Sequence, residues 1–349
     1  MKKTVIIKVI LIAMATVLIS GCGPKAQGPV LLEWSGYEME SFWEPYMEQH
    51  PDALPVYTFF ADDSEGFAKA KSGFEFDLVH PCSSWWQLYV DHGLVQPIDT
   101  SRITHLDAFY PEMLEMGQFN GEQYFLPWEW GYESILVRTD LAPDVPESWA
   151  DLWDPQYAGH ISMYDASEAA YLISGMSLGI DPYNATPEEQ AQIKQHLIDL
   201  KPSLLNYWLD YTEIIQLVAQ GDVWLASHAW NDAYGVLLEE GYEVEYINPT
   251  EGRLSWICGF GIGANETNLD LAYDYLNAVT APQSMANMGN EFYYGVASQD
   301  ATDLLDPFVR EIMALDDPAV LENTFFYQPL SEELRTEIEA IWSDVKASN

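Results

Sequence analysis

Positive charge is scarce in this chain, and that scarcity limits the partners that the protein can have. The sequence contains 14 Lys and Arg residues against 55 Asp and Glu residues, for a formal net charge of −41 at pH 7. Nucleic acid and anionic lipid head groups are bound through cationic patches, so we expect neither as a partner. Most of the carboxylates are expected to be solvated surface groups, but their field also favours the approach of a small cation.

Motifs that carry catalysis or bind cofactors are missing as well. The sequence has no Gly-rich phosphate loop, no Gly-x-Ser-x-Gly and no His-Glu-x-x-His, and its seven histidines are scattered. His80 and Cys82 lie two residues apart, but a zinc site needs three or four ligands. We therefore predict no metal site and no cofactor, and we do not expect an enzyme.

Cysteine is limited to three residues, Cys22, Cys82 and Cys258. In an oxidising compartment Cys82 and Cys258 could pair. Bonding requires Cα atoms within about 7 Å of each other. The spacing therefore leaves open either a disulfide or two buried free thiols.

Long apolar runs are absent apart from one near the N-terminus, residues 9–19, which is too short to span a hydrocarbon core of roughly 30 Å as a helix. It follows three lysines and ends in Ile-Ser-Gly-Cys22, an order typical of an export signal that is removed. The ending resembles a bacterial lipobox, whose cysteine carries lipid. We expect a signal peptide at residues 1–21, lipidation of Cys22, and a tether at residues 22–28. The expected location is the periplasm or the cell surface, with the lipid as the membrane attachment; an ordinary signal peptide is the alternative.

The remaining chain is longer than the size at which a single hydrophobic core usually stops growing, so we expect two domains. Predicted strands alternate with predicted helices, which favours an α/β fold with a mostly parallel sheet. The predicted strands cover residues 30–34, 56–60, 76–80, 124–128, 134–138, 160–163 and 223–226. Helices are predicted over residues 38–50, 66–71, 213–219, 269–279 and 331–346, and another begins at Thr186, where Glu189 completes a capping box.

Aromatic residues are abundant, and many of them lie at or just beyond the ends of predicted strands. These are Trp34, Tyr37, Trp85, Trp86, Trp128, Trp130, Trp230, Trp256, Tyr293 and Tyr294. Ligands of open α/β sheets bind outside the carboxyl ends of the strands. Any single tryptophan is explained by core filling, but a group of them at strand ends, with a few carboxylates, suits an amine, because aromatic faces attract cations.

Asp165 and Glu168 form the best candidate carboxylate pair. They follow the strand predicted at residues 160–163 and begin a helix, where a spacing of three places both on one face. The same spacing is that of a capping box, so a structural role is the alternative.

Seven segments together resemble the spermidine/putrescine-binding proteins of bacterial ABC importers, over nearly the whole mature chain. They are Trp-Ser-Gly-Tyr at 34–37, Phe-Asp-Leu-Val-His-Pro at 76–81, Leu-Pro-Trp-Glu-Trp-Gly at 126–131, Pro-Glu-Ser-Trp-Ala-Asp-Leu-Trp at 146–153, Asp-Ala-Ser-Glu at 165–168, Ala-Trp-Asn at 229–231 and Ser-Trp at 255–256. The resemblance implies a two-domain periplasmic-binding-protein (Venus flytrap) fold of type II. Lobe 1 would comprise residues 29–130 and 258–301. Lobe 2 would comprise residues 131–257 and 302–349, and the ligand would lie between the two lobes.

The resemblance also implies a ligand site and partners. The implied binding residues are Trp34, Tyr37, Ser83, Asp165, Glu168, Trp230, Trp256, Cys258, Tyr294 and Gln328. The implied partners are a putrescine-like or spermidine-like amine and the permease subunits of an ABC importer, and we expect a monomer.

Two departures from that family keep the ligand open. Cys258 stands where the family carries an aspartate, and Cys82-Ser83-Ser84 replaces a Ser-x-Tyr segment. Glu129 or Glu133 is a candidate to compensate; otherwise a quaternary amine or a monoamine is the alternative ligand. Two cysteines at expected cleft positions favour a disulfide more than their spacing alone does. A sensor without transport is a further alternative, and an enzyme on the same scaffold is disfavoured by the missing catalytic residues.

Overall fold

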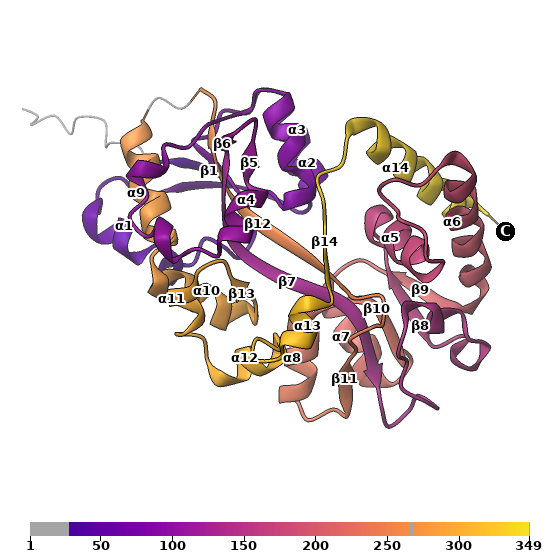
Figure 1. The fold of residues 1–349 in the computed structure, drawn as a ribbon. Coiled ribbons are helices and arrows are strands. Elements are labelled where there is room, and N and C mark those ends of the chain that lie inside the picture. The colour runs from indigo at the N-terminus through magenta and orange to yellow at the C-terminus, as the bar shows by residue number, and fades with distance from the viewer. Residues whose placement is uncertain (1–27, 266–267, 349) are drawn as a thin grey trace, which may run out of the picture.

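The computed structural model describes residues 28–265 and 268–348. The expected signal peptide, the lipidation site Cys22 and residues 22–27 of the expected tether lie outside the described residues. The described chain forms an α/β protein of two lobes, and one twelve-stranded sheet passes through both of them (Figure 1). In the described part no helix is both long and apolar enough to cross a membrane.

The first lobe begins with parallel strands, as predicted. Strand β1 (Val30–Trp34) lies between β2 (Val56–Phe60) and β3 (Leu78–Val79). The helices between and after them are α1 (Glu44–Gln49), α2 (Asp63–Lys71) and α3 (Ser83–Asp91).

Two of these helices differ in extent from the prediction. The helix predicted at 38–50 is divided into a 3₁₀ turn, η1 (Glu40–Phe42), and α1, whose first turn contains a proline. Helix α2 starts before residue 66 because the Asp62 side chain accepts a hydrogen bond from the backbone of Glu65 and caps the helix there.

Two long antiparallel strands, β7 (Phe125–Arg138) and β12 (Arg253–Gly263), connect the lobes. The sequence predicted two strands at 124–128 and 134–138, but β7 is continuous and buried along its whole length. In lobe 1, β12 pairs with β3; in lobe 2, β7 pairs with β10 (Leu225–Trp230). The lobes therefore share their central strands.

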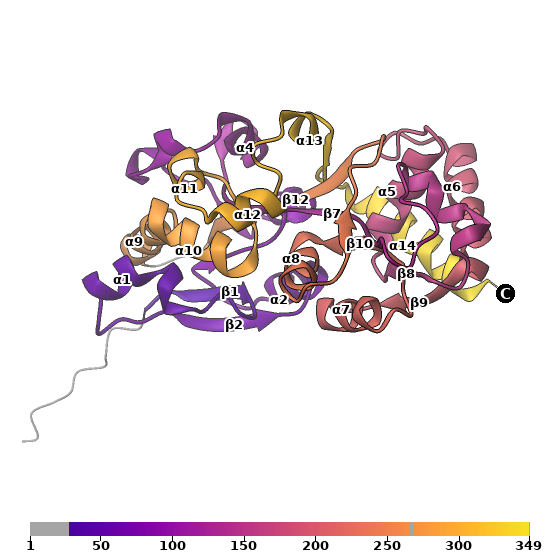
Figure 2. The ribbon, with the colours of Figure 1, turned by 90° about the horizontal axis from the view of Figure 1, so that it is seen from below.

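Lobe 2 continues the sheet with strands parallel to β10. They are β8 (Ile161–Tyr164) and β9 (Leu204–Trp208). One face is covered by α5 (Ser167–Ser177), α6 (Pro187–Leu200) and α14 (Glu332–Ala347), and the other by α7 (Tyr211–Gln220) and α8 (Asn231–Glu239) (Figure 2). One hydrophobic core fills lobe 1 and extends beneath α7 and α8, and a second lies among α5, α6 and α14. The capping box at Thr186 and Glu189 is formed as predicted.

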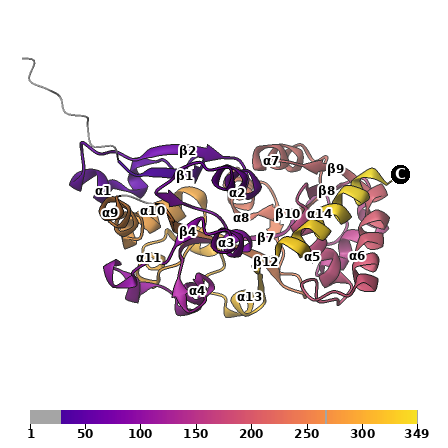
Figure 3. The same cartoon turned by 90° about the horizontal axis from the view of Figure 1, so that it is seen from above.

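The C-terminal part of the chain crosses back between the lobes. Helices α9 (Leu269–Val279), α10 (Pro282–Phe292) and α11 (Gln299–Thr302) cover lobe 1. After α12 (Pro307–Ile312) and α13 (Pro318–Glu322), strand β14 (Thr324–Phe326) pairs in parallel with the lobe 2 end of β12 and leads to α14 (Figure 1). Viewed from above, the N-terminal end of α14 lies next to α3 of lobe 1 (Figure 3).

The remaining elements are short. They are β4 (Val95–Gln96), η2 (Thr100–Arg102), η3 (Leu106–Ala108), α4 (Pro111–Met116), β5 (Gln118–Phe119), β6 (Glu122–Gln123), η4 (Trp149–Trp153), η5 (Pro155–Tyr157), η6 (Lys201–Ser203), β11 (Val244–Tyr246) and β13 (Gly295–Val296).

Candidate functional site

A cavity of about 660 Å³ lies between the lobes, at the ends of β1, β8 and β10 and against the crossing strands β7 and β12. Eight of the ten residues implied by the resemblance line it: Trp34, Tyr37, Asp165, Glu168, Trp230, Trp256, Cys258 and Tyr294. Residues from segments far apart in the chain therefore meet in one place, as the strand-end rule predicts.

The aromatic side chains of the cavity are held in position by contacts outside it. Trp34 donates its indole N–H to the carbonyl of His80 (2.8 Å), and its ring lies 4.5 Å from that of Phe60. Trp256 and Tyr294 meet edge to face with ring centroids 4.8 Å apart. Trp34, Trp256 and Tyr294 are only partly buried and line the cavity, whereas Phe60 belongs to the core behind Trp34.

Gly131 of β7 allows the Trp256 ring to lie in this place. A Cβ atom at Gly131 would collide with the Trp256 ring and with the Asn231 side chain. Asn231 in turn accepts a hydrogen bond from the Tyr132 backbone at 2.8 Å. The motif Trp-Gly at 130–131 thus serves the packing of an aromatic residue on the neighbouring strand.

Other aromatic residues proposed for the site fill the core instead. Trp86, Trp128 and Trp130 are at most 4% exposed, and their ring N–H groups donate to backbone carbonyls. Tyr293 donates to Glu239 on the outer side of α8 and does not line the cavity. Trp85 does line it. The position of an aromatic residue at a strand end therefore does not show whether it lines the cavity or fills the core. Alternate residues of one strand face opposite sides of the sheet.

Two carboxyl groups of β7, Glu129 and Glu133, line the cavity; we call them the strand pair. Tyr37 donates its hydroxyl to Glu129 Oε1 at 2.6 Å, and Tyr327 donates to Glu133 Oε2 at 2.7 Å. Burial raises the pKa of Glu129 to about 7 and that of Glu133 to about 8. In the described part of the chain neither residue forms an ion pair with a lysine or arginine.

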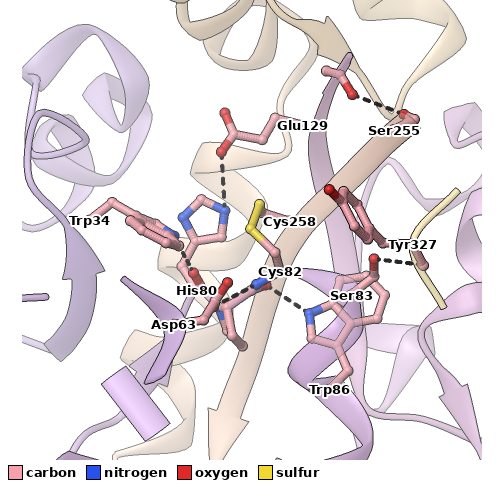
Figure 4. Close-up of a disulfide and its surroundings, with 12 residues drawn as sticks. Trp34, Asp63, His80, Cys82, Ser83, Trp86, Glu129, Ser255, Cys258 and Tyr327 are labelled. Atoms are coloured by element: carbon pink, nitrogen blue, oxygen red, sulfur yellow. Dashed lines mark hydrogen bonds and ion pairs between the residues drawn. A yellow bond between two sulfur atoms is a disulfide. The ribbon is translucent and has the colours of Figure 1, made fainter. Parts of the chain in front are cut away.

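A buried histidine lies behind Glu129 (Figure 4). His80 Nδ1 is 2.7 Å from Glu33 Oε1, and its Nε2 is 3.7 Å from Glu129 Oε1. Burial opposes a charge on His80, but these two carboxyls outweigh it and raise the pKa of the imidazole. Glu129 Oε2 has no hydrogen-bond partner among the described residues, so one acceptor at the cavity wall remains available.

Asp63 and Asp232 add two more buried carboxyls. Asp63 lines the cavity and accepts a hydrogen bond from the backbone of Cys82 at 3.0 Å. Asp232 lies behind Tyr294 and accepts from its hydroxyl at 3.3 Å. Burial raises the pKa of both to about 7.

Asp165 and Glu168, which we call the helix pair, lie at the start of α5. The N-cap of α5 is Ala166, and no side chain caps the helix, so the capping-box alternative does not hold. Instead, Asp165 accepts hydrogen bonds from Lys346 (2.8 Å) and Trp342 (2.9 Å) of α14. Both donors lie in lobe 2, so Asp165 is held within its own lobe.

Glu168 is paired with an arginine of the same helix α14. Its Oε2 lies 3.5 Å from Arg335 Nη1, while its Oε1 has no hydrogen-bond partner among the described residues. Burial raises the pKa of Glu168 to about 7, although Arg335 opposes the rise. The helix pair thus differs from the strand pair in having permanent cations beside it.

Ser83 and Gln328 are the two implied residues that the structure does not place at the cavity. Ser83 is 1% exposed and donates its hydroxyl to the carbonyl of Tyr327, and its neighbour Ser84 lines the cavity instead. Gln328 is exposed, and the preceding residue, Tyr327, faces the cavity. In an extended segment consecutive side chains point to opposite sides, which accounts for the exchange of Gln328 for Tyr327. Ser83 and Ser84 lie in the first turn of α3, where consecutive side chains also point in different directions.

Cys82 and Cys258 form a disulfide in the cavity wall (Figure 4). Cys82 is the N-cap residue of α3, and Cys258 lies on β12 opposite Glu129 of β7. The bond therefore fixes α3 to the crossing strands beside the strand pair. The pairing that the sequence left open is formed.

The sequence did not assign Asp63, Asp232, Arg335 or Tyr327 to the site, and it named the strand pair as a candidate without placing it. Asp62 and Asp63 follow a strand end directly, which is a signal that could have been used. Among the described residues no group of three or more His, Cys, Asp or Glu side chains is arranged to hold a metal ion.

Comparisons with known proteins agree with this geometry. The model of a family described as bacterial extracellular solute-binding protein matches residues 65–311. The spermidine/putrescine-binding periplasmic protein of Salmonella typhimurium is 26% identical over 285 residues, covering 81% of each chain. The putrescine-binding periplasmic protein PotF of Escherichia coli is 25% identical over 298 residues, covering 78% of each.

Solved structures agree on the fold. The spermidine/putrescine ABC transporter substrate-binding protein PotD of Streptococcus pneumoniae superposes with a TM-score of 0.79 at 21% identity, covering 92% of this chain and 99% of its own. These findings confirm the resemblance inferred from the seven sequence segments, and with it the periplasmic-binding-protein fold.

Proposed function

We propose, from the premise that this chain belongs to the bacterial extracellular solute-binding protein family, that it captures a small organic amine between its lobes. The amine is then delivered to the permease of an ABC importer. The observation that carries the proposal is a surplus of carboxyl groups, most of them at least partly buried, in an aromatic cavity. Of the described residues lining that cavity, seven carry carboxyl groups and one, Arg335, carries a permanent positive charge.

This surplus favours a cation as the ligand. Burial raises the pKa of the strand pair and of Asp63 because the loss of water penalises their ionised forms more than their neighbours stabilise them, so each gains from a further positive charge. An ammonium group between them supplies that charge and allows the carboxyls to ionise. Each aromatic face that the ammonium contacts adds about 0.5–2 kcal/mol, depending on how far it is desolvated.

The class of amine is suggested by the relatives, whose names state that they bind spermidine or putrescine. A polyamine is therefore the first candidate, and a monoamine or quaternary amine the second. In either case the ligand would contact both lobes, here proposed as residues 29–130 with 258–301 and residues 131–257 with 302–349. A ligand that touches both lobes stabilises their closed arrangement.

Tyr37, Trp34 and Glu129 would hold the ligand from lobe 1, and Trp230, Glu133 and Glu168 from lobe 2. No catalytic role is proposed for any of them. The protein is proposed to act as a monomer, in keeping with an interlobe cavity whose lining residues all come from one chain.

Location outside the cytoplasm is part of the proposal. The relatives are named as periplasmic proteins, and the signal and lipobox-like segment of this chain ends at Cys22. Growth of expressing cells with labelled palmitate should label the wild-type protein and not Cys22→Ala. Equal labelling of the two proteins would contradict lipidation of Cys22.

Isothermal titration calorimetry tests the function directly. Purified, dialysed protein is titrated at pH 8 with putrescine, spermidine, a four-carbon monoamine and choline, and with a sugar and a carboxylic acid as controls. We expect heat of binding from at least one amine. Binding of the sugar or the acid with no heat from any amine would overturn the proposal.

A further inference from the structure

The cavity is asymmetric in charge, and Arg335 produces the asymmetry. The strand pair faces the cavity without a lysine or arginine partner in the described chain, and Glu129 Oε2 is unpartnered. The helix pair is matched by cations from α14: Arg335 stands beside Glu168 and Lys346 beside Asp165. An incoming cation therefore meets, at β7, carboxyls whose nearest cationic group is the imidazole of His80, and, at α5, carboxyls already paired with Arg335 and Lys346.

Arg335 is held firmly in this position. It lies one turn into α14, and its backbone N–H donates to the carbonyl of Ser331, the N-cap residue, at 3.0 Å. Across the interlobe boundary its Nη2 donates to the carbonyl of Ser84 at 2.7 Å, and its guanidinium lies 3.8 Å from the centre of the Trp85 ring. A stacked and hydrogen-bonded guanidinium is not easily displaced by a flexible ammonium.

The atoms left without partners at this end indicate what a ligand can offer there. Glu168 Oε1 is a buried acceptor and Arg335 Nε a buried donor, and neither has a hydrogen-bond partner among the described residues. Arg335 is 9% exposed, and both residues line the cavity. A neutral group that both donates and accepts, such as a hydroxyl or an amide, satisfies both atoms without adding charge.

A second ammonium group would bind less favourably than a neutral group beside Glu168 and Arg335. It would gain Glu168 as a partner but would lie beside a guanidinium that already neutralises that carboxylate. Buried like charges at close range repel, and the repulsion is weakly screened there. The end of the cavity next to α14 therefore disfavours a ligand with two cationic ends.

We propose that Arg335 is a specificity-determining residue, a resident cation that makes the cavity select amines with one ammonium group and a neutral hydrogen-bonding group at the other end. The ammonium lies at the strand pair and the neutral group at Glu168 and Arg335. This inference rests on the proposed capture of an amine and narrows its class.

The experiment uses a matched pair of ligands, putrescine and 4-aminobutan-1-ol, which differ in one end group. Calorimetry at pH 8 on the whole purified protein should show 4-aminobutan-1-ol binding about tenfold more tightly than putrescine. Arg335→Met, which keeps an unbranched stem as far as the position of Nε and removes the charge, should improve putrescine binding about tenfold and abolish the preference. Arg335→Lys, which keeps the charge, should retain it.

Two further variants separate charge from packing. Arg335→Met combined with Glu168→Gln should lose the gain for putrescine, because no free carboxylate is left for the second ammonium. Lys194→Gln removes an exposed cation that pairs with Asp344 elsewhere on α14 and should leave the preference unchanged. Thermal unfolding of each variant shows whether it is folded, and Arg335→Lys tests the charge even if Arg335→Met unfolds.

The outcomes distinguish this inference from the proposed function. If the wild type binds putrescine as tightly as 4-aminobutan-1-ol or more tightly, the inference is overturned while amine capture stands. A preference that persists in folded Arg335→Met also overturns it. If neither ligand nor any other amine binds, the proposed function fails and the inference falls with it.

Discussion

The strand pair and the helix pair are both carboxyl pairs facing one cavity, yet their surroundings differ. Glu129 and Glu133 lie on a strand that is buried from end to end, and their neighbours are tyrosines and a histidine. Asp165 and Glu168 lie at the partly buried start of a helix, where a second helix supplies a lysine and an arginine. The comparison shows that the affinity of a carboxylate for a cationic ligand depends more on the charges already beside it than on whether it belongs to Asp or Glu.

Removal of one charge from each pair should give the largest difference. Glu129→Gln should weaken amine binding by about 3–5 kcal/mol, because an ammonium would be left buried without its partner. Asp165→Asn should cost at most about 1 kcal/mol, because partly exposed Lys346 already pairs with Asp165. Calorimetry on both variants measures the contrast, and equal losses would show that the two pairs serve the ligand alike.

The disulfide next to the strand pair should affect stability more than specificity. It joins residues 176 positions apart, so Cys82→Ser with Cys258→Ser should lower the free energy of unfolding by about 2–4 kcal/mol. Urea unfolding of the ligand-free proteins provides the measurement. The choice between two matched amines should survive the change; its loss would mean that the bond, rather than Arg335, shapes the cavity.

Proton release on binding should reveal the ionisation of the strand pair through the pH dependence of stability and affinity. In the folded protein the pKa of Glu129 is raised to about 7 and that of Glu133 to about 8, above those of the unfolded chain. The folded state therefore retains protons that the unfolded state has lost, and the ligand-free protein should lose stability as the pH rises from about 5 to 8. An ammonium stabilises the ionised carboxyls, so its affinity should increase over pH 6 to 8, by up to about tenfold per unit for each proton released.

Calorimetric titrations in buffers that differ in ionisation enthalpy measure the number of protons released when the amine binds. The increase in amine affinity with pH should be smaller in Glu133→Gln, which has one fewer carboxyl group with a raised pKa. Affinity that is constant between pH 6 and 8 would contradict the role of the strand pair.

The aromatic residues should show the smallest effects. Trp256→Leu should weaken amine binding by about 0.5–2 kcal/mol through the loss of a ring face and should leave folding largely intact, because the ring is only partly buried. The matched change Trp128→Leu, in the core at 1% exposure, should instead lower stability. Denaturation and calorimetry on the two variants distinguish a ligand contact from a core contact. Loss of stability in Trp256→Leu together with loss of affinity in Trp128→Leu would contradict both assignments.

Much of the architecture follows from local patterns. Alternating strands and helices identified the α/β class, and the Thr186 capping box gave the start of α6. The strands at 124–128 and 134–138 could not be recognised as a single strand, because Gly131 lies between them and glycine is typical of a break in a strand. In the folded protein, pairing with β12 on one side keeps the strand continuous.

Site residues that follow the ends of strands could be predicted from the sequence. Residues that reach the cavity from distant segments of the chain could not. Trp34, Trp230 and Trp256 were found from position and family segments. Arg335 was not, because on an amphipathic C-terminal helix an arginine is typical of a solvated face. Its contact with Ser84 spans 251 positions, and no local pattern encodes such a distance.

The placement of β12 has a consequence for how the molecule is made. This strand lies in the middle of the sheet, between β3 and β7, but it begins at Arg253, after most of the chain has been synthesised. The half-sheets β2-β1-β3 and β7-β10-β8-β9 pair without it, but they are joined only when β12 pairs with both β3 and β7, so until then each half presents an unpaired strand edge. Completion of the sheet therefore depends on a segment in the last third of the chain, and a product truncated before Arg253 would lack the strand that joins the two lobes.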